Sequence, residues 1–160
     1  MTALRFVSMP TDQARAFRAG APDANGQPPE RHAATEDGLP CRHCQRPIAA
    51  GAPYLILAYR PFRAVRPYAE LGPIFLHGET CERHPDSAEL PLMFRDWKTV
   101  LIRGYGADDR IVYGTGEVVT PDGVSSAAER VLARDDVRYV HLRSSTNNCY
   151  QLRIESACAE

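Results

Sequence analysis

Four residues in the first half of the chain constrain its fold more than any other feature. Cys41 and Cys44 stand in Pro-Cys-Arg-His-Cys, and His77 and Cys81 stand in His-Gly-Glu-Thr-Cys, so the pattern is C-x2-C-x32-H-x3-C. Thiolate and imidazole groups at this spacing hold a tetrahedral Zn²⁺ ion in many small domains. The pattern predicts one zinc site, with Zn²⁺ as cofactor, in a metal-binding segment from 41 to 84. Four protein ligands leave no open position for chemistry, which indicates a structural metal.

Two other histidines compete for the fourth ligand position. His84 follows Cys81 by three residues, and His43 lies inside the knuckle, where intervening side chains usually splay outward. We favour His77, because it ends a predicted strand and sheet packing would fix its position. A pair of free or redox-active thiols is the alternative for the knuckle, but a redox pair normally opens a helix. Pro47 disfavours a helix there.

Two enzymatic hypotheses remain open beside the structural metal. The two motifs are also the halves of the nucleobase deaminase signature, in which Glu79 would shuttle protons beside an open zinc. The halves occur in reverse order, however, and Cys81 is available to close the site. Cys149 and His141 lie on adjacent predicted strands, where a thiol–imidazole pair would permit nucleophilic catalysis. A histidine on an apolar strand is more often a hydrogen-bonded core residue, so whether the chain is an enzyme stays undecided.

Arginine and aromatic residues supply the candidates for ligand binding. Arginines alternate with aromatic residues in the proline-broken stretch 59–68, which includes Arg60, and such a stretch could contact phosphates and stack on bases. The formal net charge of −1 supplies no general attraction for nucleic acids or membranes. Arg103, Tyr105 and Tyr113 are candidates to line one face of a sheet, where they could hold a small anion or simply form a solvated face. A small-molecule or protein ligand is therefore favoured over nucleic acid.

The pattern of apolar residues predicts a single α+β domain over residues 1–160. The chain is 44% hydrophobic and 24% charged, as expected of a soluble globular protein. We expect a mainly antiparallel sheet, two or three helices and the zinc knuckle. Residues 20–40 are rich in proline and glycine, which predicts an irregular loop. The predicted helices are 11–18 and 126–134, and 90–97 is a short helix or an extended arm. The predicted strands are 4–7, 54–59, 73–77, 99–105, 111–119, 137–142 and 149–154.

Alternation in the last predicted strand assigns its side chains to two faces. Tyr150, Leu152 and Ile154 are expected to face the core, and Gln151 and Arg153 are expected to point away from it.

Cysteine usage and hydropathy bear on the compartment. No apolar run approaches the roughly 20 residues that a membrane helix needs, and the start lacks a signal-peptide pattern, so we expect a cytoplasmic protein. In that setting five cysteines favour metal or free thiols over disulfides. An exposed sheet edge would allow a homodimer, although no residue specifies one.

Several stretches form a recognisable set and occur in a fixed order. They are Pro-Cys-Arg-His-Cys at 40–44, Leu-Ala-Tyr-Arg-Pro-Phe at 57–62, Gly-Pro-Ile-Phe-Leu-His at 72–77, Arg-Gly-Tyr-Gly-Ala-Asp-Asp-Arg-Ile-Val at 103–112, Tyr-Val-His-Leu-Arg at 139–143 and Cys-Tyr at 149–150. From Leu4 to Ile154 the chain resembles the bacterial family of uncharacterised proteins known as domain of unknown function 1203. The resemblance implies a single-domain, cytoplasmic protein in which the metal supports the fold, and it implies no activity. In the final turn, Ser144 replaces an expected asparagine and Asn148 an expected glycine.

The sequence therefore predicts a binding or accessory module built around a structural zinc. The alternative is a zinc-dependent hydrolase or deaminase that uses Glu79, or thiol chemistry at Cys149 and His141.

Overall fold

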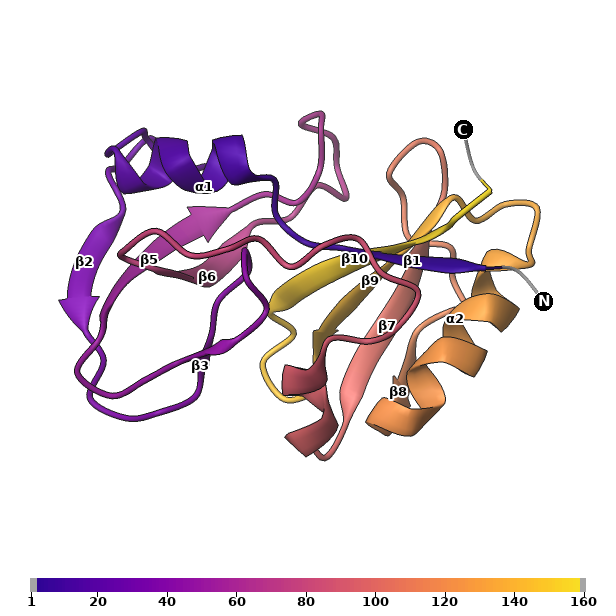
Figure 1. Ribbon diagram of the computed structural model, residues 1–160. Coiled ribbons are helices and arrows are strands. Elements are labelled where there is room, and N and C mark those ends of the chain that lie inside the picture. Colours follow the sequence, from indigo (N-terminus) through magenta and orange to yellow (C-terminus); the bar gives the residue numbers. More distant parts are fainter. Residues whose placement is uncertain (1–2, 159–160) are drawn as a thin grey trace.

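The computed structural model describes residues 3–158, and its largest element is a five-stranded antiparallel sheet. The strand order is β1-β10-β9-β7-β8, and helix α2 (Val124–Leu132) covers one face of this sheet (Figure 1). The strands are β1 (Leu4–Val7), β7 (Val100–Tyr105), β8 (Glu117–Val119), β9 (Tyr139–Ser144) and β10 (Tyr150–Ser156).

A second, smaller group of elements lies beside this sheet and contains the cysteine knuckle (Figure 1). A three-stranded antiparallel sheet has the order β2-β5-β6, and a two-residue pair, β3 with β4, flanks the knuckle. The elements of this group are α1 (Thr11–Arg18), β2 (Glu30–Ala33), β3 (Leu39–Pro40), β4 (Pro47–Ile48), β5 (Pro53–Tyr59) and β6 (Gly72–His77). Two short 3₁₀ helices, η1 (Leu92–Asp96) and η2 (Pro121–Gly123), belong to the connections. The predicted α+β class with mainly antiparallel sheets is confirmed.

Two hydrophobic cores follow from this arrangement. The first lies between α2 and the large sheet, where Ile102, Leu142 and Val131 are among the buried side chains. The second lies around β5 and β6, and the buried Cys41 and Cys44 belong to it. The knuckle cysteines therefore share the core of the smaller group with large apolar side chains such as Leu55, Ile74 and Leu76.

The other face of the large sheet carries polar and aromatic side chains. Arg103 pairs in register with His141, Leu152 pairs with Leu142 on the core face, and a bulge lies between Tyr150 and Leu152. The bulge brings Tyr150 opposite Arg143 and onto the polar face, because one extra residue inverts the alternation. The inward prediction for Tyr150 was therefore wrong, whereas Leu152 and Ile154 are fully buried as predicted.

Two stretches differ from their predicted structure. The predicted irregular loop 20–40 contains β2, whose four residues are all exposed and pair with β5 through backbone hydrogen bonds. An exposed edge strand carries no apolar alternation, so no local pattern indicated this strand. Of the predicted strand 111–119, only β8 and an isolated bridge at Ile111 pair. Among residues 3–158, no helix is both long and apolar enough to cross a membrane.

Candidate metal centre

A tight turn between β3 and β4 presents the first two cysteines. The amide of Gln45 donates to the carbonyl of Cys41 at 3.0 Å, and the amide of Cys41 donates to the carbonyl of Arg46 at 3.1 Å. Gln45 closes the turn with φ 55°, in the left-handed region that few non-glycine residues adopt. The amide of Arg42 donates to the carbonyl of Phe75 at 3.1 Å, which fixes the knuckle against β6.

The four predicted ligands converge in the fold. One ligand atom from each of Cys41, Cys44, His77 and Cys81 lies within 4.8 Å of the other three. The Sγ atoms of Cys41 and Cys81 are 4.0 Å apart, and Cys44 Sγ is 3.4 Å from His77 Nδ1. A tetrahedral zinc with bonds of about 2.3 Å to sulfur and about 2.0 Å to nitrogen requires separations of roughly 3.8 and 3.5 Å. The donor set therefore fits Zn²⁺ in both chemistry and spacing.

The two competing histidines take other roles. His84 Nδ1 lies 2.8 Å from the carbonyl of its neighbour Pro85, and His84 is not part of the four-residue cluster. His43 is buried, with Nδ1 at 3.1 Å from Cys81 Sγ and Nε2 at 2.9 Å from the hydroxyl of Thr11. Burial, followed by the nearby Arg18, lowers the pKa of His43, which favours the neutral ring. A neutral His43 with its proton on Nδ1 donates to the sulfur and accepts from Thr11.

Other N–H groups surround the sulfur atoms. Arg18 on α1 donates from Nη2 to Cys81 Sγ at 3.0 Å and from Nε to the carbonyl of His77 at 3.0 Å. The amide of His77 lies 3.4 Å from Cys41 Sγ and donates to it. Such donors stabilise thiolates and orient ligands around a metal. The Arg18 guanidinium thus contacts both residues of the second ligand pair, His77 and Cys81.

The thiol groups of the cluster shift one another's pKa values. Hydrogen bonds from Cys44 and Cys81 lower the pKa of the Cys41 thiol. The same contact between Cys41 and Cys44 raises the pKa of the Cys44 thiol. Three adjacent thiolates repel one another unless a cation lies among them. A divalent ion would permit all three sulfurs to be ionised together.

Glu79 borders this cluster on its solvent side. It is exposed and lines a pocket of about 330 Å³ together with His77, Cys44 and Cys81. The pocket shows that solvent reaches the vicinity of the ligands. The position of Glu79 is compatible with the deaminase hypothesis, but Cys81 supplies a fourth donor.

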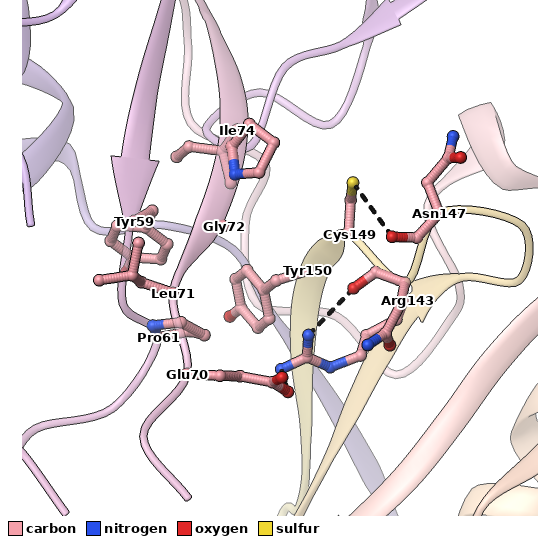
Figure 2. Close-up of a pocket in the computed structure, with 12 residues that line it drawn as sticks. Tyr59, Pro61, Glu70, Leu71, Gly72, Ile74, Arg143, Asn147, Cys149 and Tyr150 are labelled. Atoms are coloured by element: carbon pink, nitrogen blue, oxygen red, sulfur yellow. Dashed lines mark hydrogen bonds and ion pairs between the residues drawn. The ribbon is translucent and has the colours of Figure 1, made fainter.

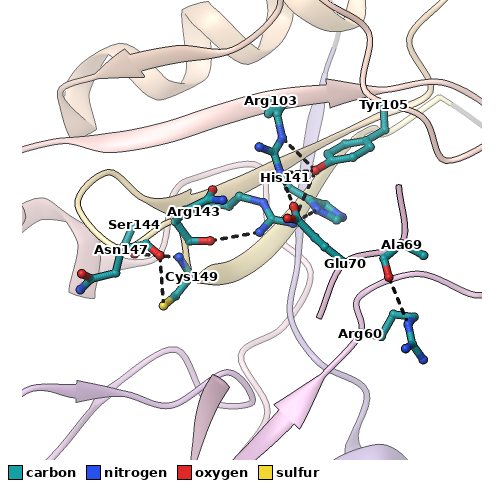
Figure 3. A network of polar contacts seen from close by, with 11 residues as sticks. Arg60, Ala69, Glu70, Arg103, Tyr105, His141, Arg143, Ser144, Asn147 and Cys149 are labelled. Atoms are coloured by element: carbon teal, nitrogen blue, oxygen red, sulfur yellow. Dashed lines mark hydrogen bonds and ion pairs between the residues drawn. The ribbon is translucent and has the colours of Figure 1, made fainter. Parts of the chain in front are cut away.

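The predicted thiol–imidazole pair is separated in the fold. Cys149 Sγ points toward the carbonyl of Asn147 at 3.7 Å, whereas the His141 ring contacts the guanidinium of Arg143, 3.2 Å from Nδ1 (Figure 3). His141 is fully buried, and burial, then the Arg143 charge, lowers its pKa well below the ordinary histidine range. Within residues 3–158 its Nε2 has no hydrogen-bond partner.

The predicted ligand-binding residues are only partly brought together. Arg103 lies on the polar face with Tyr105, and its Nε donates to the Tyr105 hydroxyl at 2.9 Å. Tyr113 is 72% exposed and bonds through its hydroxyl to Tyr68, so it does not join that face. Arg60 donates to the carbonyl of Ala69 at 3.2 Å, in the connection between β5 and β6.

Three residues that the sequence did not single out complete the polar network. Arg143 and Glu70 meet beside Arg103 (Figure 3), and Arg42 extends from the knuckle to β10. Alternation with His141 on β9 could have indicated Arg143. No local pattern marks Glu70 in its connection.

The fold and site define a class: single α+β chains in which three cysteines and a histidine form a cluster suited to a metal ion. The chain belongs to the family described as "Protein of unknown function (DUF1203)", whose model matches residues 38–156. The match includes all four cluster residues and the polar face from β7 to β10. No curated protein and no solved structure matches the chain.

Proposed function

We propose that the chain is a zinc-stabilised binding or accessory protein in which Cys41, Cys44, His77 and Cys81 hold one structural Zn²⁺. The proposal includes a reducing, cytoplasmic setting, because free thiols must persist for the metal to bind. Zinc would clamp the knuckle to the end of β6 and complete the smaller core, since a metal that joins two segments contributes its binding energy to folding.

One observation supports the structural role above the catalytic one. The cluster offers four soft or imidazole donors at tetrahedral spacing, and N–H donors from Arg18, His43 and the His77 backbone already contact its sulfurs. Catalytic zinc sites normally have three protein ligands and a water. Here Cys81 would take the position of that water.

Metal content and coordination test the proposal. Protein purified without added metal is analysed by elemental analysis and by zinc-edge X-ray absorption. We expect one zinc per chain with three sulfur ligands and one nitrogen ligand. Cys81→Ser should lose zinc and unfold at lower temperature, whereas the control Cys158→Ser, at an exposed tail thiol, should retain both metal and stability.

Two outcomes would count against the structural site. Absence of metal, with unchanged stability after chelation, would remove the zinc proposal. Two sulfurs, one nitrogen and one oxygen would show an open metal and favour the hydrolase or deaminase alternative. In that case Glu79→Gln should abolish turnover while zinc content stays unchanged.

A further inference from the structure

A pocket of about 220 Å³ lies where the connection between β5 and β6 crosses the polar face of the large sheet. We call residues 60–71 of this connection the strap. The pocket is bounded by the strap and by the β9–β10 turn, with Glu70, Arg143 and Tyr150 among its walls (Figure 2). It lies apart from the zinc cluster, none of whose four residues lines it. Its lining residues are Tyr59, Pro61, Glu70, Leu71, Gly72, Pro73, Ile74, Arg143, Asn147, Asn148, Cys149 and Tyr150.

Two arginines meet at one carboxylate oxygen of Glu70 at the edge of this pocket. Arg143 is among the residues that line the pocket, and Arg103, which does not line it, reaches the carboxylate from β7. Glu70 Oε1 lies 2.5 Å from Nη2 of Arg103 and 3.3 Å from Nη2 of Arg143 (Figure 3). The Arg143 side chain is only 4% exposed, whereas that of Glu70 is 47% exposed. The interior therefore holds two guanidinium charges that share one anion from the solvent side. Two positive charges here face one negative charge, so the site favours an anion that contacts both guanidinium groups more closely.

Arg143 is also incompletely satisfied by its neighbours. Its Nη1 donates to the carbonyl of Asn148 at 3.1 Å, and its Nη2 donates to His141 Nδ1 at 3.2 Å. Its Nε is buried and has no hydrogen-bond partner within residues 3–158. An unpartnered donor on a buried charged group is costly, so a retained one indicates a site for an acceptor.

Glu70 reaches the arginines from a segment with little internal structure. The strap contains Pro61 and Pro67 and forms no strand or helix, and its side chains are mostly exposed or half-buried. Arg60 donates to the carbonyl of Ala69 at 3.2 Å, one residue before Glu70. A rotation of the half-exposed Glu70 side chain toward solvent would release the arginines while Phe62 keeps the strap packed against Tyr105 and His141.

We propose that this pocket binds a small organic carboxylate, which replaces the Glu70 carboxylate on Arg103 and Arg143. In the unliganded chain Glu70 occupies the site as an internal ligand. The bound carboxylate would accept from both guanidinium groups, with Arg143 Nε as the additional donor that Glu70 leaves unused. This inference rests on the proposed role as a binding protein, and it does not depend on zinc.

The pocket walls restrict the rest of the ligand. Tyr59, Pro61, Ile74 and Tyr150 offer apolar or aromatic surface beside the arginines. The volume is smaller than the roughly 300–1,000 Å³ of pockets for drug-sized ligands. The ligand class is therefore a small monocarboxylate with a compact apolar or aromatic body. A planar carboxylate also matches the fork of a guanidinium group, a bidentate contact that Glu70 does not make because it uses one oxygen for both arginines.

Calorimetric titration of the zinc-loaded chain with benzoate, isobutyrate and inorganic phosphate tests the proposal. Glu70→Gln removes the internal anion and should raise the benzoate affinity at least tenfold over the wild type. The control Glu36→Gln removes an exposed carboxylate that does not line the pocket, and it should leave the benzoate affinity unchanged. Arg103→Gln, in a Glu70→Gln background, should lower the affinity again at least tenfold. In the wild type, saturating benzoate should shift the Arg143 Nε–H resonance.

Three results would overturn the carboxylate proposal. The first is that neither carboxylate binds Glu70→Gln saturably at millimolar concentration. The second is that Arg103→Gln leaves the benzoate affinity unchanged. The third is that phosphate binds more tightly than benzoate. Zinc content is measured on every variant, so a failure of the metal site is distinguishable. A zinc-free chain that still binds benzoate would contradict the structural zinc alone, whereas a zinc-loaded chain that binds no carboxylate would contradict this inference alone.

Discussion

The guanidinium of Arg42 donates from Nε to the carbonyl of Tyr150 at 2.6 Å, and this contact ties the cysteine knuckle to the bulge in β10. Arg42 Nη1 donates to the carbonyl of Pro40, also at 2.6 Å, and the side chain is fully buried. Burial lowers the pKa of Arg42 to about 10, so it stays charged at neutral pH. Arg42, one of the two residues between the cysteines, thus contacts the strand whose Tyr150 lines the pocket beside Arg143.

Replacing Arg42 by methionine should destabilise the chain on the order of 3 kcal/mol. The change keeps much of the side-chain length but leaves two buried carbonyl oxygens without their charged donor. Urea unfolding of the zinc-loaded protein measures the effect. Arg46→Met, two residues beyond the knuckle at an exposed position, should change stability by less than about 0.5 kcal/mol. Equal effects of the two substitutions would show that the Tyr150 contact contributes little.

Much of the fold could be predicted because several of its helices and strands have clear local sequence patterns. Leu4–Val7, Thr11–Arg18 and Val100–Tyr105 combine apolar periodicity with flanking turn residues, and the structure has a strand, a helix and a strand there. The predicted bounds 126–134 of the second helix were wrong by two residues at each end, because α2 begins at Val124, directly after the 3₁₀ turn η2, and ends at Leu132. The residue at which a helix begins depends on the conformation of the preceding residues, which a local sequence pattern does not specify.

The metal cluster was predictable and the polar network was not, for one physical reason. Ligand spacing is a local property of the knuckle and of the β6 exit, so Cys41, Cys44, His77 and Cys81 could be grouped before any fold was known. The approach of Glu70 to Arg143 depends on a connection that crosses β9, a strand about seventy positions later in the chain. The bulge at Tyr150 likewise inverts a face without any glycine or proline to mark it.

The final turn shows a departure from the family pattern that the backbone explains. Asn148, where the resemblance leads one to expect glycine, has φ 57°. Asparagine is among the few residues that tolerate this left-handed conformation, so the substitution preserves the turn. The turn matters because the Asn148 carbonyl accepts from Arg143.

Arg18→Met should weaken zinc binding about tenfold with little change in fold. The substitution removes the guanidinium donor to Cys81 Sγ and the contact with the His77 carbonyl, and groups that orient ligands typically contribute 10–100-fold to metal affinity. Competition with a chromogenic chelator measures the affinity. Arg15→Met, an exposed position in the last turn of the same helix, is the matched control. An unchanged affinity for Arg18→Met would mean that the N–H···S contact does not stabilise the thiolate.

Gly104→Ala should destabilise the chain by about 1–3 kcal/mol, since overpacking forces neighbours apart. A Cβ at this position would lie 2.8 Å from Val131 Cγ1 and 3.0 Å from the Thr115 hydroxyl, where α2 packs closely on β7. Thermal unfolding measures the loss. Gly116→Ala places its methyl in open space and should be near neutral, and Val131→Ala should partly rescue Gly104→Ala. Similar losses at both glycines would rule out the close approach as the cause.

His141 should make the chain less stable as the pH falls. The groups that face it are the Phe62, Tyr105, Tyr139 and Tyr150 rings and the Arg103, Arg143 and Arg153 guanidinium groups. Burial, and then the charges of these arginines, hold the folded-state pKa of His141 well below the unfolded value of about 6.5. Below that value the unfolded chain binds a proton that the folded chain excludes, so stability is present above about pH 6.5 and is lost as the pH falls toward the folded pKa.

Comparison with variants isolates this contribution from that of the proposed zinc site, whose ligands would also be protonated in acid. His141→Phe and His141→Asn remove the titrating ring, and Asn keeps an acceptor for Arg143. Chemical unfolding between pH 5 and 7 at saturating zinc should give the wild type a steeper slope than either variant, by up to about 1.4 kcal/mol per pH unit for one proton. Parallel slopes would show that His141 is protonated equally in both states. The buried ring would then have a proton acceptor at Nε2, in contradiction to the fully enclosed environment of that atom.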